Sequence, residues 1–220
     1  MDSSAPSRLT PLQRELLEAF FARDQGFFLT GGAALAGFYL GHRETDDLDL
    51  FGPPDLELDR AVRALAGAAA ACGAGLRSLQ HYPEFRRFIA ERGDERCVVD
   101  LAIDRAPAVV ADKIVFGAVR VDSLREIAAN KVCTLIGRAE IKDLVDLQAL
   151  LAAGVELGQA LDDAARKDAG VDPATLAWIL DQVTITAAAR LPGGTDPGVL
   201  DAFRRDLVRR LRALAFASVR

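Results

Sequence analysis

The chain has 220 residues, half of which are hydrophobic, and it carries a formal net charge of -5 at pH 7. This length suffices for one large domain, or for a core with an appended subdomain, that folds by itself. The acidic balance excludes a protein that coats nucleic acid with its whole surface, so any RNA site has to be a local basic patch.

The cysteines and the apolar segments indicate in which cellular compartment the protein is located. Cys72, Cys97 and Cys133 are odd in number and widely spaced, which fits small core side chains in a reducing compartment better than disulfides or a metal site. The N-terminus shows no basic region followed by an apolar stretch, and no segment reaches the ~20 apolar residues of a membrane span. We therefore expect a cytoplasmic protein without a membrane partner.

The first predicted elements lead to a glycine turn. Helical spacing of apolar residues over Pro11–Phe21, with Thr10 as a possible cap, predicts a helix. A strand over Phe27–Thr30 then stops at Gly31-Gly32, where the backbone can turn sharply. The next residues, beginning with Ala33, are compatible with a helix, whose free N–H groups would favour an anion such as a phosphate.

A second strand carries carboxylates. Asp47 and Asp49 share one face by alternation, while Leu48 and Leu50 share the other. Side by side, two carboxylates repel unless a cation lies between them, and such a hard-oxygen pair suits Mg²⁺ better than zinc. The alternative is an acidic strand end that is merely solvated.

The middle of the chain predicts a helix, a hairpin and a third carboxylate. A helix over 58–72 ends at Gly73, and short strands over 76–80 and 85–91 are compatible with an antiparallel hairpin. The strand over 97–104 places Asp100 in an apolar run. Because burying an unpaired carboxylate is costly, Asp100 needs a partner or lies at an opening.

The second half is predicted to be helical, and its first helix directs a lysine inward. Val119–Val121 is a last short strand, and Ser123 with Glu126 has the spacing of a capping box. Lys131 falls on the apolar face of the helix that follows. Spacing alone favours a lysine that snorkels along the edge of the core.

The later helices carry acids and arginines. Asp143 and Asp146 lie in the first turn of the next helix, a placement that the helix dipole alone would favour. Further helices are predicted over 157–167, 173–189 and 197–217. The last has an inward stripe ending at Leu214 and a basic surface outside it, formed by Arg204, Arg205, Arg209, Arg210 and Arg212. A solvated face and a contact with an RNA backbone are equally compatible with this cluster.

Together, the glycine turn, the short helix and the Asp-x-Asp strand resemble the polymerase-β-like nucleotidyltransferases. The segments Gly-Gly-Ala-Ala-Leu-Ala, Leu-Gly-His-Arg and Asp-Leu-Asp-Leu-Phe, followed by the lysine helix and Lys-Asp-x-x-Asp-Leu, closely resemble the AbiEii/AbiGii toxin family of that superfamily. The resemblance covers about residues 27–151. It departs from the superfamily pattern at Ala33, where Ser or Thr usually follows the glycines.

The resemblance implies roles for these residues. Asp47 and Asp49 would hold Mg²⁺ or Mn²⁺, and Asp100 would bind the metal or orient the acceptor hydroxyl. Lys131 would offset the charge of the triphosphate. The phosphate-binding residues would be Gly31, Gly32, Ala33 and Arg43, and Asp143 and Asp146 would support the lysine or the substrate.

The expected fold is α/β, with a polymerase-β-like core over residues 1–122 and a helical C-terminal region over 123–220. The expected function is metal-dependent transfer of a nucleoside monophosphate from an NTP to an acceptor. That acceptor would be an RNA such as a tRNA 3′ end, and the protein would be the toxin of a toxin–antitoxin pair with a cognate antitoxin. The alternatives are an enzyme that modifies a small molecule of the antibiotic type, or a non-catalytic protein that binds nucleotide or antitoxin.

Overall fold

The structure is a computed structural model that describes residues 7–217. Its elements are the mixture of helices and strands that an α/β fold requires, as predicted. The chain divides into two compact units. One comprises Met1–Arg105 with Ala111–Ser123, and the other comprises Ala106–Val110 with Leu124–Arg220. The sequence had not indicated that residues 106–110 belong with the second unit.

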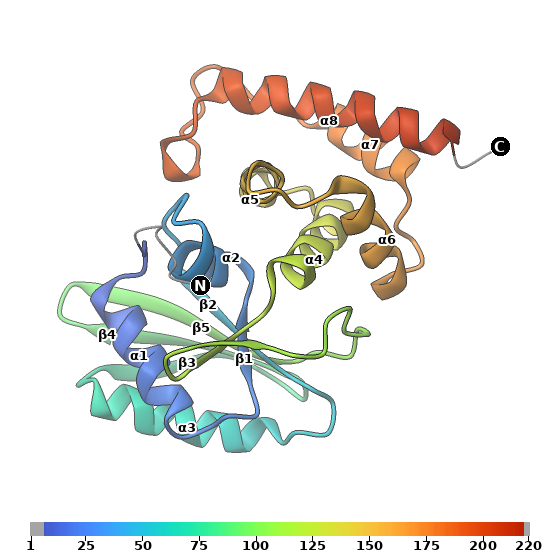
Figure 1. Cartoon of the computed structure of the whole chain (residues 1–220). Helices are drawn as coiled ribbons and strands as arrows, with labels where there is room; N and C mark the ends of the chain where they lie inside the picture. Colours follow the sequence, from blue (N-terminus) through green and yellow to red (C-terminus); the bar gives the residue numbers. More distant parts are fainter. Residues whose placement is uncertain (1–6, 218–220) are drawn as a thin grey trace. The chain divides into compact units, whose positions relative to one another are not determined.

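The first unit is built on one mixed sheet (Figure 1). Its strands run in the order β3-β4-β5-β2-β1-β7-β6, with β2 parallel to β5 and β1 parallel to β7. In chain order its elements are α1 (Pro11–Phe21), β1 (Phe28–Thr30), α2 (Gly31–Ala34), a π-helical turn (Leu35–Tyr39), β2 (Asp47–Gly52), α3 (Leu58–Ala71), β3 (Gly75–Tyr82), β4 (Phe85–Arg92), β5 (Glu95–Ile103), β6 (Ile114–Phe116) and β7 (Val119–Val121).

The hydrophobic core of the unit lies on one face of this sheet. Helices α1 and α3 pack on it (Figure 1) and cover a layer of aliphatic side chains that are at most 1% exposed. That layer comprises Leu29, Leu48, Leu50, Val99, Leu101 and Val121. Helix α1 begins where predicted, because Thr10 and Gln13 form a reciprocal capping box and Pro11 occupies the first turn. The alternating polar residues of β1, β2 and β5 are thereby directed to the opposite face.

The second unit is helical. Its elements are α4 (Leu124–Gly137), α5 (Ile141–Ala152), α6 (Leu157–Lys167), α7 (Pro173–Gln182), a 3₁₀ turn (Pro192–Gly194) and α8 (Pro197–Ala217). The Glu126 carboxylate ties the segment 106–110 to this unit, since it accepts the backbone N–H groups of Val109 and Val110 at 2.8 Å and forms a buried ion pair with Lys167. None of the helices within residues 7–217 combines the length and apolar composition needed to cross a lipid bilayer.

The structure differs from the predicted elements in three places. Helix α7 ends at Gln182 instead of residue 189, because the run that begins at Val183 is rich in β-branched residues, and Val183 itself is extended. Strand β6 was missed; a two-residue turn at Gly117 joins it to β7, with the positive φ of 60° that glycine permits. Leu214 does not face the core, since it is 36% exposed.

Candidate functional site

A row of polar side chains crosses the sheet of the first unit on the face opposite α1 and α3. The strand register places Arg87 of β4 beside Asp100 of β5, Asp100 beside Asp49 of β2, and Asp49 beside Thr30 of β1. Residues paired in this way point to the same side of a sheet, with adjacent strands about 4.8 Å apart. Asp47, two residues before Asp49, shares that face. The two predicted acids and the third carboxylate are therefore neighbours.

The glycine turn lies against Asp49. Gly31 directly follows β1 and has a φ of 65°, and a Cβ atom at this position would lie 2.2 Å from Oδ2 of Asp49. Next to it, a Cβ atom at Gly32 would lie 2.5 Å from Nη2 of Arg43. Thus the predicted phosphate-binding residues Gly31, Gly32 and Arg43 lie together, and Gly31 lies against Asp49. Ala33 is fully buried in the short helix that follows.

Asp47 is held by the loop that precedes its strand. The Oγ1 hydroxyl of Thr45 donates a 2.6 Å hydrogen bond to Oδ1 of Asp47. The backbone carbonyl of Thr45 accepts a 2.7 Å hydrogen bond from Nε2 of Gln13, the residue that also caps α1. Arg43, only 5% exposed, donates to the carbonyl of Glu44 at 2.9 Å. The core helix α1 therefore fixes the loop that orients Asp47.

Asp100 forms a bidentate ion pair with Arg87. Nε and Nη2 of Arg87 donate to the two carboxylate oxygens at 2.7 Å and 2.6 Å, and Asp100 is 5% exposed. The hydrogen bond to Asp100 is the largest cause that raises the pKa of Arg87, with smaller contributions from the charges of Asp47 and Asp49. Sequence reasoning had not identified Arg87, because the predicted hairpin joined 76–80 to 85–91, whereas Asp100 lies on the strand that pairs with the other edge of β4.

In the second unit, the inward lysine of α4 meets the two acids of α5. Nζ of Lys131 lies 2.8 Å from Oδ1 of Asp143 and 2.6 Å from Oδ2 of Asp146. Both acids are fully buried and Lys131 is 6% exposed. Nε of Arg138 lies 3.0 Å from Oδ2 of Asp143. Lys131 is thus a buried member of an ion-pair cluster, and the expectation from spacing that it snorkels to the core edge is wrong.

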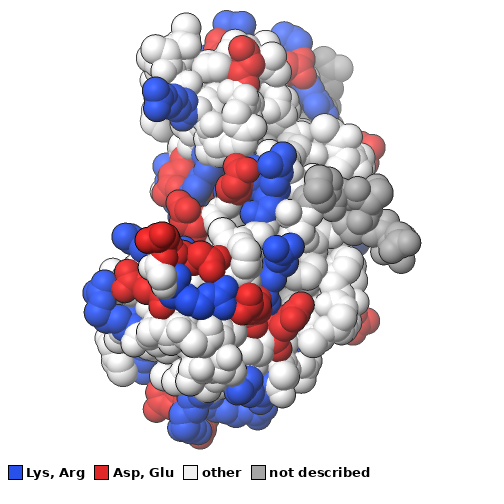
Figure 2. Space-filling view, turned by 90° about the vertical axis from the view of Figure 1, so that its left-hand side faces the viewer, with Lys and Arg blue, Asp and Glu red and all other residues white. Residues whose placement is uncertain are grey.

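Four of the five arginines predicted as a basic surface are paired with aspartates. Arg204 and Arg205 contact Asp201, and the remaining pairs are Arg209 with Asp206 and Arg212 with Asp181. Arg204 also donates to the carbonyl of Leu180, and its side chain is only 12% exposed. Because of these pairs, the local positive charge of α8 is smaller than the sequence indicated. On the face of the molecule drawn in Figure 2, basic and acidic side chains are interspersed.

The chain matches a known protein family over most of its length. The family profile described as "Nucleotidyl transferase AbiEii toxin, Type IV TA system" matches residues 15–216. The chain belongs to the AbiEii family. It is therefore a nucleotidyltransferase, as the sequence resemblance implied, and the type IV toxin–antitoxin system named for the family implies an antitoxin. A search of curated proteins found no match.

Two solved structures share the fold over nearly the whole chain. A protein from H. pylori assigned as a nucleotidyltransferase is 20% identical, with a TM-score of 0.54 over 92% of this chain and 94% of that chain. JHP933 from Helicobacter pylori is 21% identical, with a TM-score of 0.53 over 94% and 93%. The predicted polymerase-β-like fold is thereby confirmed for this AbiEii protein.

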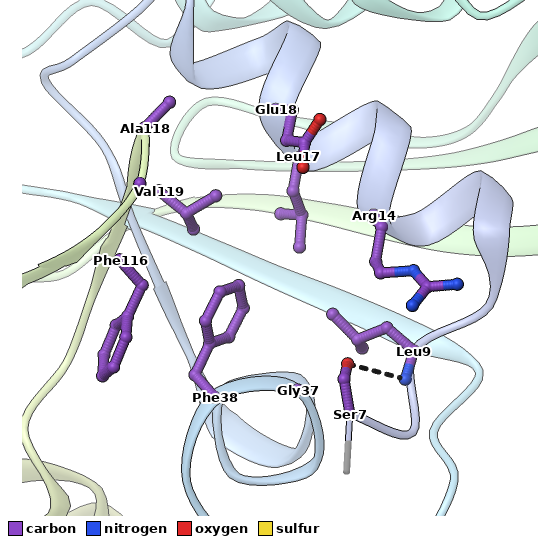
Figure 3. A pocket seen from close by; sticks show the side chains of 11 residues that line it. Ser7, Leu9, Arg14, Leu17, Glu18, Gly37, Phe38, Phe116, Ala118 and Val119 are labelled. Carbon is purple, nitrogen blue, oxygen red and sulfur yellow. Dashed lines mark hydrogen bonds between the residues drawn. The ribbon is translucent and has the colours of Figure 1, made fainter. Parts of the chain in front are cut away.

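A cavity of about 390 Å³ in the first unit lies apart from the residues predicted for the AbiEii site. The helix α1, the segment around Phe38 and the β6–β7 turn surround it (Figure 3). Its lining is largely apolar and includes Leu9, Leu17, Phe38, Phe116 and Val119. Arg14 and Glu18 of α1 also line it. It contains none of the aspartates of the polar row.

Proposed function

We propose that this AbiEii protein transfers a nucleoside monophosphate from an NTP to an acceptor hydroxyl in a reaction that requires Mg²⁺ or Mn²⁺. The observation that carries the proposal is the position of Asp49, which lies against the glycine turn and beside Asp100 while sharing a sheet face with Asp47. The acids to which we assign the metal and the backbone to which we assign the phosphates are thus adjacent.

The donor set fits a hard divalent cation. No group of three His, Cys, Asp or Glu side chains within residues 7–217 is arranged to hold a metal ion by itself. Mg²⁺, however, is usually bound through one or two carboxylates together with substrate phosphates and water. We assign that role to Asp47 and Asp49. Asp100, expected from the sequence as a third ligand, has both oxygens engaged by Arg87 in this structure.

In the proposed reaction the acceptor hydroxyl gives up its proton to water and its oxygen forms a bond to the α-phosphorus. The bond from that phosphorus to the oxygen bridging the β-phosphate breaks, and pyrophosphate leaves. When bound, the metal would neutralise triphosphate charge and polarise the α-phosphate. Each oxygen of Asp100 has a second lone pair besides the one that Arg87 occupies, so Asp100 can accept a hydrogen bond from the acceptor hydroxyl. Arg87 would fix the direction of that carboxylate.

Lys131 would supply positive charge to the triphosphate, in keeping with the role that the family resemblance implies. An ammonium group has three N–H donors, of which Asp143 and Asp146 take two. The two acids would therefore orient the ammonium group while leaving one donor for a phosphate oxygen. Charge that develops on the leaving pyrophosphate is stabilised most by a donor that is already oriented.

The catalytic assignment is tested by Asp47→Asn and Asp49→Asn. Each substitution keeps the side-chain shape and removes the charge that binds the metal, so Mg²⁺-dependent nucleotide transfer should be abolished while thermal unfolding changes little. Asp94→Asn, at an exposed residue outside the row, serves as the control. Full activity in either site variant would remove that residue from the site.

We further propose that the acceptor is RNA, such as a tRNA 3′ end. In the second unit Arg205, Arg209 and Arg212 line a depression of about 410 Å³ together with Val208 and Asp181. These arginines are exposed, and exposed ion pairs contribute only about 0–1 kcal/mol, so their aspartate partners present a low barrier to exchange for phosphates. Three arginines on one helix face suit a chain of phosphates better than a small molecule.

The RNA proposal is tested by the salt dependence of binding. Converting Arg205, Arg209 and Arg212 together to Gln should weaken RNA binding and reduce the log–log salt slope by about 0.7 to 0.9 per lost phosphate contact. A matched control converts three exposed arginines of the first unit, Arg63, Arg77 and Arg96, so that the change in net charge is identical. An unchanged slope in the first variant would contradict the RNA proposal and favour a small-molecule acceptor.

A further inference from the structure

Thr30 carries a buried hydroxyl without a hydrogen-bond partner. Its Oγ1 atom makes no hydrogen bond within the described part of the chain, and the residue is 3% exposed. Leaving a buried hydroxyl unpaired costs free energy, so such an atom requires an explanation. The hydroxyl of Thr45, by contrast, has a 2.6 Å bond to Asp47.

The position of Thr30 indicates what the hydroxyl would bind. Thr30 is the last residue of β1, pairs directly with Asp49, and therefore shares the face of the polar row. It is also the residue before Gly31 and the N-cap of α2, yet its side chain makes no capping hydrogen bond. The hydroxyl thus neither caps the helix nor joins the network of the row, although Thr30 adjoins the glycine turn in sequence and pairs with Asp49, a proposed metal ligand.

We infer that Thr30 Oγ1 binds a phosphate oxygen of the nucleotide substrate. This inference rests on the proposed function, in which the triphosphate lies over Asp47, Asp49 and the glycine turn. A hydroxyl can donate to a phosphate oxygen, which supplies the partner that the free protein lacks. Ala33, on the other side of the glycines, has no polar side-chain atom, so Thr30 is the hydroxyl nearest to the turn in sequence.

The test compares Thr30→Val with Thr30→Ser in the full chain. Valine keeps the shape and strand preference of threonine and removes only the hydroxyl. Because that hydroxyl is unpaired in the free protein, Thr30→Val should be at least as stable to heat as the wild type. It should bind Mg²⁺–NTP about 10-fold more weakly or worse, as expected when a hydrogen bond to a charged group is lost. Thr30→Ser should bind close to the wild type.

Calorimetric titration with each of the four NTPs, together with thermal unfolding without nucleotide, gives both readouts. Wild-type affinity in Thr30→Val would overturn the inference. A variant that loses stability and affinity together would also overturn it, because the hydroxyl would then serve the fold. Asp49→Asn separates the two proposals: if it abolishes transfer while Thr30→Val binds like the wild type, only the role of Thr30 fails. If it retains transfer, the proposed function fails, and the inference that rests on it fails as well.

Discussion

Replacing Lys131 by Met should destabilise the protein severely, contrary to what a lysine at the core edge would do. The substitution preserves most of the aliphatic stem but removes an ammonium group that lies 2.8 Å and 2.6 Å from two fully buried carboxylates. Removing one partner of a buried ion pair typically costs about 3–5 kcal/mol, because the remaining charge is uncompensated. For a chain of this length, that corresponds to a decrease of roughly 6–20 °C in Tm.

Thermal or urea unfolding of purified variants measures this loss. Lys142→Met is the matched control, since Lys142 is in the same unit with a side chain that is 37% exposed, and it should stay within about 0.5 kcal/mol of the wild type. Adding Asp146→Asn to Lys131→Met should recover part of the loss, because it removes one of the two buried carboxylates that the ammonium group contacts. If Lys131→Met is as stable as the control, the buried ion-pair cluster is not formed in solution.

The same cluster predicts a dependence on pH. Burial by itself would lower the pKa of Lys131, but the charges of Asp146 and Asp143 and their hydrogen bonds raise it by more, so that it lies above its ordinary value of 10.5. A raised pKa in the folded state contributes stability that is fully present below about pH 10.5 and is lost as the pH rises through the folded value. The difference in stability between wild type and Lys131→Met should therefore shrink in strongly alkaline solution.

Three further predictions concern Arg87, Gly31 and Cys97. Arg87→Met should lower kcat/KM for nucleotide transfer. Arg87→Lys should restore only part of kcat/KM, because lysine cannot make the bidentate contact with Asp100. Wild-type kinetics in both variants would show that Arg87 does not position Asp100. Gly31→Ala should abolish transfer by displacing Asp49, whereas Gly93→Ala, at a similar positive φ in open space, should cost stability alone. Cys97 is fully buried and burial raises its pKa to about 12, so iodoacetamide should alkylate it after Cys72 and Cys133 in the native protein, as mass spectrometry would reveal.

Local signals in the sequence predicted much of the fold. The capping residue Thr10 with Pro11, and the apolar periodicity of the segments 157–167 and 197–217, gave helices with the boundaries that the structure shows. These features depend on residues close together in the chain. The end of α7 was misjudged because apolar periodicity was extended across a β-branched run beginning at Val183, where backbone preference decides.

Long-range pairing was the part that sequence could not supply. That Asp47 and Asp49 share a face follows from alternation within one strand, and so it was predictable. The partner of Asp100 depends on the register between β4 and β5, a hairpin that was not among the predicted elements, and Arg87 was therefore overlooked. Likewise, the partner of Arg212 is Asp181 on a different helix, which sequence spacing does not reveal. The other pairs of α8, with Asp201 and Asp206, are three or four residues apart and were overlooked although helical spacing predicts them.

The most direct test of nucleotidyl transfer is whether the α-phosphate of an NTP becomes attached to RNA. Wild-type protein is incubated with Mg²⁺, total RNA and each NTP labelled at either the α- or the γ-phosphate, with EDTA and Asp49→Asn as negative controls. We predict that RNA acquires label from the α-phosphate of at least one NTP and none from the γ-phosphate, and that both controls abolish incorporation. Label transferred from the γ-phosphate, or incorporation that persists in Asp49→Asn, would contradict nucleotidyl transfer at this site.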